Sequence, residues 1–196
     1  MRWKRGGAAP GAPGRESGRG GVFPSPGLAE LLGAVARLSP ARFLDLGPAQ
    51  ESTIELLTHR HIEVQVAALE PDALGRGPLP DFEAASFTGI LCWDYLVRLP
   101  PTARPRLAAA ISRWLAPGGG ALLVLPIPAR AGLQTFRFRA RSERELEYVP
   151  QGPLDPALVP TTRKILEMFE DLDCTGARIL RHGAREFVLR KTRVPV

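Results

Sequence analysis

The chain has 196 residues, 44% of them hydrophobic, which is enough for one domain with its own core but not for two. Of its net charge of +6, a charge of +4 lies within residues 1–21 rather than on the folded part, which argues against a nucleic-acid partner. No apolar run has the length of a membrane span or the form of a signal peptide. We therefore expect a cytoplasmic protein with no membrane partner.

The amino-terminal segment, residues 1–21, is dense in Gly and Pro and holds hardly any large apolar side chain beyond Trp3. Such a segment buries too little surface to offset the entropy lost on ordering. We expect a disordered basic tail over residues 1–21 and one folded domain over residues 22–196.

The cysteines and histidines lack the spacing of a disulfide framework or a metal site. Cys92 and Cys174 are far apart and form no CxxC pair, which favours two buried, reduced thiols. His59 and His61 lie two residues apart, and no carboxylate spacing nearby would complete a set of ligands. We therefore expect no metal.

Helical and strand-like patterns alternate along the first two thirds of the domain. Ser25, the proline after it and apolar residues at helical spacing up to Leu38 predict an amphipathic helix that Ser25 caps. Short apolar runs predict four buried strands, and a helix over residues 102–115 precedes the last of them. These strands cover residues 42–46, 63–69, 87–93 and 121–125. Ser52 and Glu55 have the spacing of a capping box for a short helix after the first strand.

The last third of the chain predicts antiparallel elements. Residues 117–120, with the sequence PGGG, would end the preceding helix. Residues 134–149 alternate aromatic and arginine side chains and predict a hairpin. A helix follows around residues 165–172, and residues 177–180 and 186–189 predict a closing antiparallel pair. The whole pattern predicts an α/β fold with a mostly parallel sheet, covering helices and a C-terminal antiparallel hairpin.

Five segments along this pattern have motif-like sequences. FLDLGPAQ forms a strand and a turn, and Glu70 follows Gly47 by 23 positions, near the ~20 expected for a carboxylate that binds ribose hydroxyls. The later segments are LPDFEAASFTGILCWDYLVRLP, LAPGGGALLVLP, FEDLDCTGARILR and REFVLRK. Together these segments resemble the class I S-adenosylmethionine-dependent methyltransferases. The resemblance implies a Rossmann-like fold and S-adenosylmethionine as the cofactor.

The resemblance also implies a role for particular residues. Asp45 would hold the methionine amino group of the cofactor, Glu70 would bind the ribose, and Gly47 would let the backbone pass close under the cofactor. The cofactor-binding residues that it implies are Asp45, Gly47, Ala49, Glu70, Cys92 and Trp93. Asp94, just past a strand end, is the candidate catalytic acid or base, and a helix-cap or turn aspartate is the alternative interpretation.

The sequence departs from the family's pattern at the turn. Ala49 and Glu51 stand where the family carries glycine, and Pro48 removes a backbone donor. A carboxylate of Glu51 that pointed inward would repel the cofactor's own carboxylate. Only 16 residues separate Glu70 from Phe87, so we expect the family's third strand and its helix to be missing or reduced.

Aromatic side chains are the candidates for contacts with the substrate and with adenine. The hairpin 134–149 would overhang the pocket, and we expect Phe136, Phe138 and Tyr148 to select the substrate. The same Phe/Arg alternation is compatible with binding of single-stranded nucleic acid, but an amphipathic strand explains it more simply. Phe82 would either stack on adenine or pack under its loop.

The first functional hypothesis is a methyltransferase that acts on an unidentified small-molecule or protein acceptor near Trp93 and Asp94. The alternative is a catalytically inactive binding or regulatory protein that kept the fold and lost the cofactor, which Pro48 and Glu51 favour. The sequence indicates neither the acceptor nor the oligomeric state.

Overall fold

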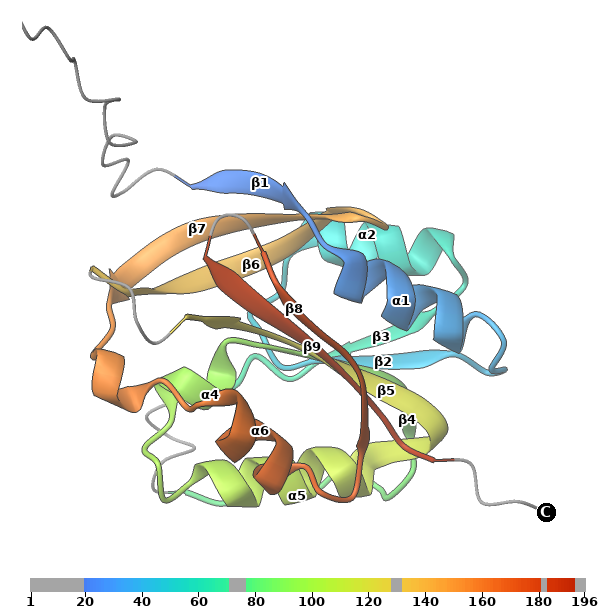
Figure 1. Cartoon of the computed structure of the whole chain (residues 1–196). Helices are drawn as coiled ribbons and strands as arrows, with labels where there is room; N and C mark the ends of the chain where they lie inside the picture. The colour runs from blue at the N-terminus through green and yellow to red at the C-terminus, as the bar shows by residue number, and fades with distance from the viewer. Residues whose placement is uncertain (1–19, 71–76, 128–131, 181–182, 193–196) are drawn as a thin grey trace, which may run out of the picture.

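The computed structural model describes residues 20–70, 77–127, 132–180 and 183–192 (Figure 1). The predicted tail therefore lies outside the described residues except for its last two positions. Gly21, which the sequence assigns to the tail, is the first residue of strand β1 (Gly21–Pro24). Among the described residues, no helix is both long and apolar enough to cross a membrane.

A six-stranded sheet forms the centre of the fold. Its strands are β2 (Arg42–Asp45), β3 (Glu63–Val66), β4 (Phe87–Trp93), β5 (Leu115–Pro126), β8 (Asp173–Ile179) and β9 (Ala184–Arg190). The order is β3-β2-β4-β5-β9-β8, and the first four strands are parallel. β9 runs antiparallel to both β5 and β8. This mostly parallel sheet with a closing antiparallel hairpin confirms the predicted Rossmann-like α/β fold.

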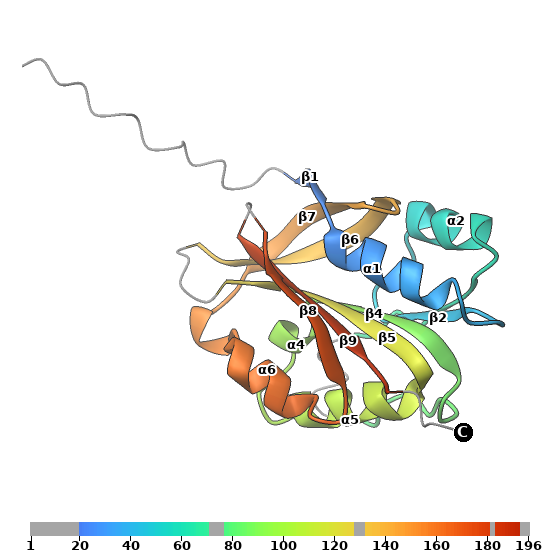
Figure 2. The same ribbon diagram turned by 45° about the vertical axis from the view of Figure 1, so that its right-hand side comes forward.

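Helices cover both faces of this sheet. They are α1 (Pro26–Val35), α2 (Glu51–His59), α4 (Tyr95–Arg98), α5 (Arg104–Trp114) and α6 (Thr162–Met168), with a short 3-10 turn, η1 (Pro156–Leu158). Figure 1 shows α1 and α2 on one side of the sheet and α4, α5 and α6 on the other, and Figure 2 shows the same layers after rotation. The central strands are therefore buried on both faces, which explains their continuous apolar sequences.

The packing of β2 against β4 depends on a missing side chain. Gly89 lies opposite Phe43 in the register of these strands, and a Cβ at Gly89 would stand 2.2 Å from the Phe43 ring. The glycine gives the fully buried Phe43 its space in the core. Because β2 and β4 pair in parallel, their carboxyl ends are neighbours.

A buried carboxylate fixes α1 to β9. Ser25 is the N-cap of α1, as predicted, and its hydroxyl oxygen accepts from the Leu28 amide at 3.1 Å. The Ser25 hydroxyl donates to Glu186, and the Gly27 amide donates to the same carboxylate at 2.8 Å. Burial raises the pKa of Glu186, while Ser25 and Gly27 favour its ionised form. A negative charge at the first turn of α1 also complements the helix dipole.

A second, three-stranded sheet lies on the side of α1 and α2 (Figure 1). Its strands are β1, β6 (Gln134–Ser142) and β7 (Glu145–Pro153), in the order β1-β7-β6, and all pairs are antiparallel. β6 and β7 form the hairpin predicted over residues 134–149, and β1 was not predicted. We call β6 and β7 together the cap hairpin.

Three local predictions are wrong. The capping box of Ser52 and Glu55 does not form, because α2 already begins at Glu51 and its N-cap is Gln50. Residues 117–120 do not separate a helix from a strand, since they lie inside the long strand β5. The strand predicted over residues 63–69 ends at Val66.

Only part of the segment in which the third strand was expected to be missing is described. No strand is present over residues 77–86, between β3 and β4, and residues 71–76 lie outside the described chain. Phe82 packs edge-on against Phe87 and Trp114, with ring centroids 5.4 and 5.1 Å away. It therefore packs against the core near the start of β4, and not at the strand end where a cofactor would bind.

Candidate functional site

The strand order places a switch point between β2 and β4. The chain leaves β2 for β3 on one side and later returns to form β4 on the other. Open α/β sheets bind their ligands outside the carboxyl ends of the strands at such a point. Here those ends are Asp45 and Trp93.

A cavity of about 250 Å³ lies at this point. The loops after β2 and β3, the end of β4 with α4, and the cap hairpin all contribute to its walls. The lining residues are Gly47, Pro48, Ala68, Leu69, Glu70, Trp93, Asp94, Tyr95, Arg98, Phe136, Arg137, Phe138 and Gln151. The hairpin predicted to overhang the pocket is therefore one of its walls.

Asp45 is a buried carboxylate that accepts two hydrogen bonds beside the cavity. Its side chain is 1% exposed, and its Oδ1 accepts from the Gly47 amide at 2.8 Å and from the Trp93 indole N–H at 2.6 Å. Burial raises the pKa of Asp45 to about 6, although the two hydrogen bonds favour the ionised form. The carboxylate thus links the turn after β2 to the end of β4.

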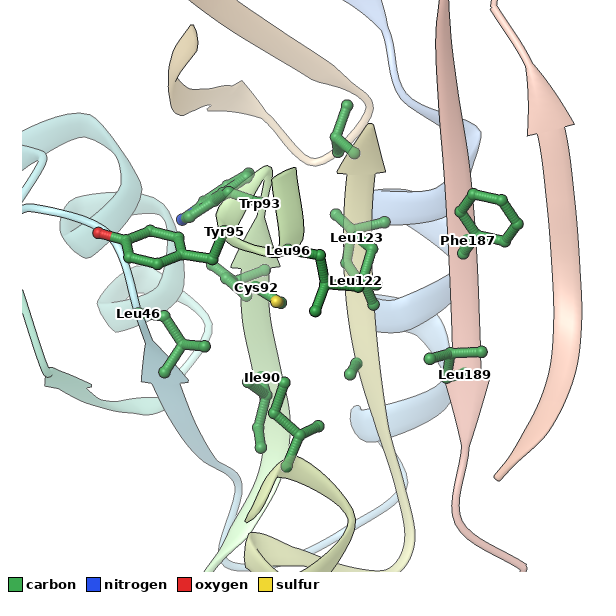
Figure 3. Packing of buried hydrophobic residues seen from close by; sticks show 14 of the residues in the cluster. Leu46, Ile90, Cys92, Trp93, Tyr95, Leu96, Leu122, Leu123, Phe187 and Leu189 are labelled. Atoms are coloured by element: carbon green, nitrogen blue, oxygen red, sulfur yellow. The ribbon is translucent and has the colours of Figure 1, made fainter. Parts of the chain in front are cut away.

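Trp93 covers the Gly47 turn. A Cβ at Gly47 would stand 2.9 Å from the Trp93 indole nitrogen, so the ring lies directly against the glycine. The other partner of the ring is Phe138 of β6, stacked at 5.9 Å with an interplanar angle of 13°. Figure 3 shows the Trp93 ring at the end of β4 with its nitrogen turned toward the side of β2. The backbone at Trp93 has a φ of +51°, which costs a bulky residue about 1 kcal/mol or more.

Asp94 attaches the cap hairpin to α4. Its fully buried carboxylate accepts from the Arg98 Nε at 2.8 Å and, on the other oxygen, from the Phe136 amide at 2.8 Å. Arg98 also donates to the Phe136 carbonyl oxygen. Burial raises the pKa of Asp94, and Arg98 with the Phe136 amide partly offsets that rise. Asp94 is the N-cap residue of α4 but makes no side-chain capping bond.

Thr53 provides a second attachment for the same strand. The Ala140 amide of β6 donates to the buried Thr53 hydroxyl oxygen of α2 at 2.9 Å. Two amides on the outer edge of β6 are therefore bound by buried side chains on either side of Phe138. The sequence analysis did not identify Thr53, and no local sequence pattern points to it. It also did not identify Arg98, although its i,i+4 spacing from Asp94 is typical of an ion pair on a helix.

The remaining predicted site residues have different surroundings. Glu70 lines the cavity with an exposed side chain, and the Tyr95 hydroxyl donates to the carbonyl oxygen of neighbouring Leu69 at 2.7 Å. Ala49 is exposed and does not line the cavity. Cys92 is fully buried, and Figure 3 shows its sulfur on the side of β5, away from the Tyr95 ring. Burial raises the pKa of the Cys92 thiol, so this group stays protonated.

Tyr148 and Glu51 do not line the cavity. Tyr148 packs behind Phe136, with ring centroids 5.2 Å apart, and does not line the cavity. Glu51 is exposed at the first position of α2, so its carboxylate does not fill the cavity. Among the described residues, no group of three His, Cys, Asp or Glu side chains has the arrangement to hold a metal ion.

One residue that lines the cavity has the chemistry that the ribose of S-adenosylmethionine would need. On the side of β3, the exposed Glu70 offers a carboxylate of the kind that accepts ribose hydroxyls. At Asp45, to which the resemblance assigns the methionine amino group, the Trp93 indole N–H already donates to the carboxylate, and the ring lies against Gly47. With Trp93 in this position, the amino group of a methionine half would have to compete with the indole N–H for the Asp45 carboxylate.

No family model and no curated protein matches this sequence. Solved structures do match, and three are described here. A TehB-like SAM-dependent methyltransferase from Corynebacterium glutamicum is 17% identical with a TM-score of 0.52, over 85% of this chain and 88% of that one. The [4+2]-cyclase SpnF is 12% identical with a TM-score of 0.51, over 85% of this chain and 80% of that one.

The third structure contains ligands. The 1,6-didemethyltoxoflavin-N1-methyltransferase of Burkholderia thailandensis, with bound 1,6-didemethyltoxoflavin and S-adenosylhomocysteine, is 17% identical with a TM-score of 0.50. The match covers 85% of this chain and 77% of that one. At these identities the likeness establishes the fold alone, and the cyclase is a reminder that one fold serves different reactions. This chain has the Rossmann-like fold that these methyltransferases share.

Proposed function

We propose that this chain is a protein of the methyltransferase type that binds an S-adenosyl compound at the switch point, and that its activity is methyl transfer to an acceptor. The observation that carries the proposal is the cavity between the ends of β2 and β4, lined by Gly47 and Glu70. An open α/β sheet binds nucleotide-type ligands at this place, and Glu70 has the charge and position to accept the ribose hydroxyls.

The acceptor, a small molecule or a protein, would enter beside the cap hairpin. Phe136, Phe138 and Arg137 line that wall of the cavity, so the aromatic pair is in place to select an acceptor. Asp94 touches the same space, but both of its oxygens are engaged by Arg98 and the Phe136 amide. Its contribution is then to position the hairpin rather than to remove a proton. Methyl transfer from a sulfonium needs in-line positioning above all, so a dedicated base is not required.

A second candidate is a catalytically inactive binding or regulatory protein. The observation that favours it is the hydrogen bond from the Trp93 indole to Asp45, because it engages the carboxylate that would hold the methionine amino group. The same ring lies against Gly47. Pro48, which lacks a backbone donor at the turn, acts in the same direction.

Calorimetric titration with S-adenosylhomocysteine and S-adenosylmethionine tests the proposal. We expect micromolar binding that Glu70→Ala weakens ten- to a hundredfold, about 1.4 to 2.8 kcal/mol, because the ribose loses its acceptor. Glu83→Ala is the matched control, since Glu83 is an exposed carboxylate outside the cavity lining. Absence of binding at millimolar ligand to folded protein would refute the enzyme and favour the second candidate.

A further inference from the structure

The Trp93 side chain contacts two residues, Asp45 and Gly47, that the resemblance assigns to the cofactor. The resemblance assigns Asp45 to the methionine amino group of the cofactor and assigns the space over Gly47 to a close approach of the cofactor to the backbone. In the structure the Trp93 ring occupies that space, within 3.0 Å of a Cβ placed on Gly47. Its indole N–H donates to Asp45 at 2.6 Å, so one N–H donor stands in for another.

This indole is firmly held and does not lie at the surface. Trp93 is 3% exposed, and it stacks on Phe138 of the cap hairpin. The strand that carries Phe138 is bound on both sides of it, through the Phe136 amide to Asp94 and through the Ala140 amide to Thr53. Moving the indole away from Gly47 breaks the bond to Asp45 and disturbs this stack.

The backbone conformation at Trp93 also indicates that this side chain has a specific role. Its φ of +51° is in the left-handed region, which glycine and asparagine occupy readily and bulky residues rarely do. A glycine at this position would relieve the strain and would also empty the space over Gly47. The chain instead holds a tryptophan there.

We propose that Trp93 is the residue that sets the ligand class of this site: the native protein binds adenosine-class nucleosides, and the amino-acid half of an S-adenosyl ligand gains no contact while the indole lies on Gly47. This inference rests on the proposed function, because it assumes that the nucleoside half binds beside Glu70. It adds that the methionine side becomes available only when the indole leaves.

The test compares adenosine with S-adenosylhomocysteine by calorimetry, on the native protein and on Trp93→Gly. On the native protein we expect the two dissociation constants to agree within about threefold. On Trp93→Gly we expect S-adenosylhomocysteine to bind at least tenfold more tightly than adenosine, because Asp45 and the Gly47 turn become accessible. Trp93→Phe, which keeps a ring in the space, serves as the matched control, and we expect its ratio to stay near that of the native protein.

Thermal unfolding first confirms that each variant is folded. If Trp93→Gly is not folded, the comparison on the native protein still tests the assignment, because the two dissociation constants must agree there. A tenfold preference for S-adenosylhomocysteine in the native protein, or an unchanged ratio in Trp93→Gly, would overturn the assignment of Trp93 and leave the proposed function intact. Absence of binding of both ligands to all three folded proteins would overturn both.

Discussion

Two buried carboxylates in this fold have similar surroundings but different positions. Glu186 and Asp94 are 0% and 1% exposed, and each accepts a backbone amide at 2.8 Å, from Gly27 and from Phe136 respectively. Glu186 joins α1 to β9 deep in the fold, whereas Asp94 joins the cap hairpin to α4 and also lines the cavity. Burial raises the pKa of both groups. A raised pKa therefore does not by itself identify a ligand site here. Asp94 differs from Glu186 in that it lines the cavity and pairs with Arg98.

The largest expected effect comes from removing the carboxylate that has a cationic partner. Asp94→Ala leaves the Arg98 guanidinium, which is 20% exposed, without its counter-charge, and the Phe136 amide without an acceptor. We expect the free energy of unfolding to fall by about 3 to 5 kcal/mol, measured by urea denaturation. Asp94→Asn keeps an acceptor for Phe136 and should lose less. A loss below about 1 kcal/mol for Asp94→Ala would show that Asp94 does not hold the hairpin.

A pH-dependent effect of similar size is expected for Asp45. Because its pKa is raised from 3.8 to about 6 by burial, the folded state favours the protonated form. The stability that this group contributes is complete below about pH 4 and is lost as the pH rises through about 6. Relative to Asp45→Asn, the native protein should lose up to about 3 kcal/mol between pH 4 and pH 7. Urea denaturation at several pH values gives this difference, and a pH-independent difference would contradict the buried position of Asp45.

The carboxylate outside the site should have the smallest effect. Glu186→Ala leaves the Ser25 hydroxyl and the Gly27 amide without an acceptor, and we expect a loss of about 2 kcal/mol in the free energy of unfolding. Glu186→Gln retains an acceptor and should lose less than half of that. Because Glu186 does not line the cavity, adenosine affinity should be unchanged in both variants. A tenfold change in affinity would remove the distinction between the two carboxylates.

The parts of the fold that the sequence predicted are those with strong local signals. β4 was predicted with the bounds that it has from a short, mostly apolar run, and all seven of its residues are buried in the centre of the sheet. α1 was predicted from its Ser25 cap and the proline after it. β1 was missed because four residues next to the tail become a strand only by pairing with β7, more than 100 positions away.

The candidate site was predicted in outline and missed in its main contact. The positions of Gly47 and Glu70 follow from local motifs, and the structure places both on the cavity. The bond from Trp93 to Asp45 joins residues 48 positions apart and depends on the register between β2 and β4. Likewise, the attachment of Ala140 to Thr53 spans 87 positions and has no sequence pattern. Contacts of this kind follow from the assembled sheet and not from any segment of the chain.

The measurement that tests the account most directly is the NMR signal of the Trp93 indole N–H during titration with S-adenosylhomocysteine and with adenosine. Trp93→Phe identifies the signal, and Trp114, in the core near Phe82, serves as the internal reference. For the native protein we expect both ligands to bind while the Trp93 signal remains protected from solvent exchange, because the indole stays on Asp45. Loss of that protection on binding S-adenosylhomocysteine at an affinity well above that of adenosine would contradict the account.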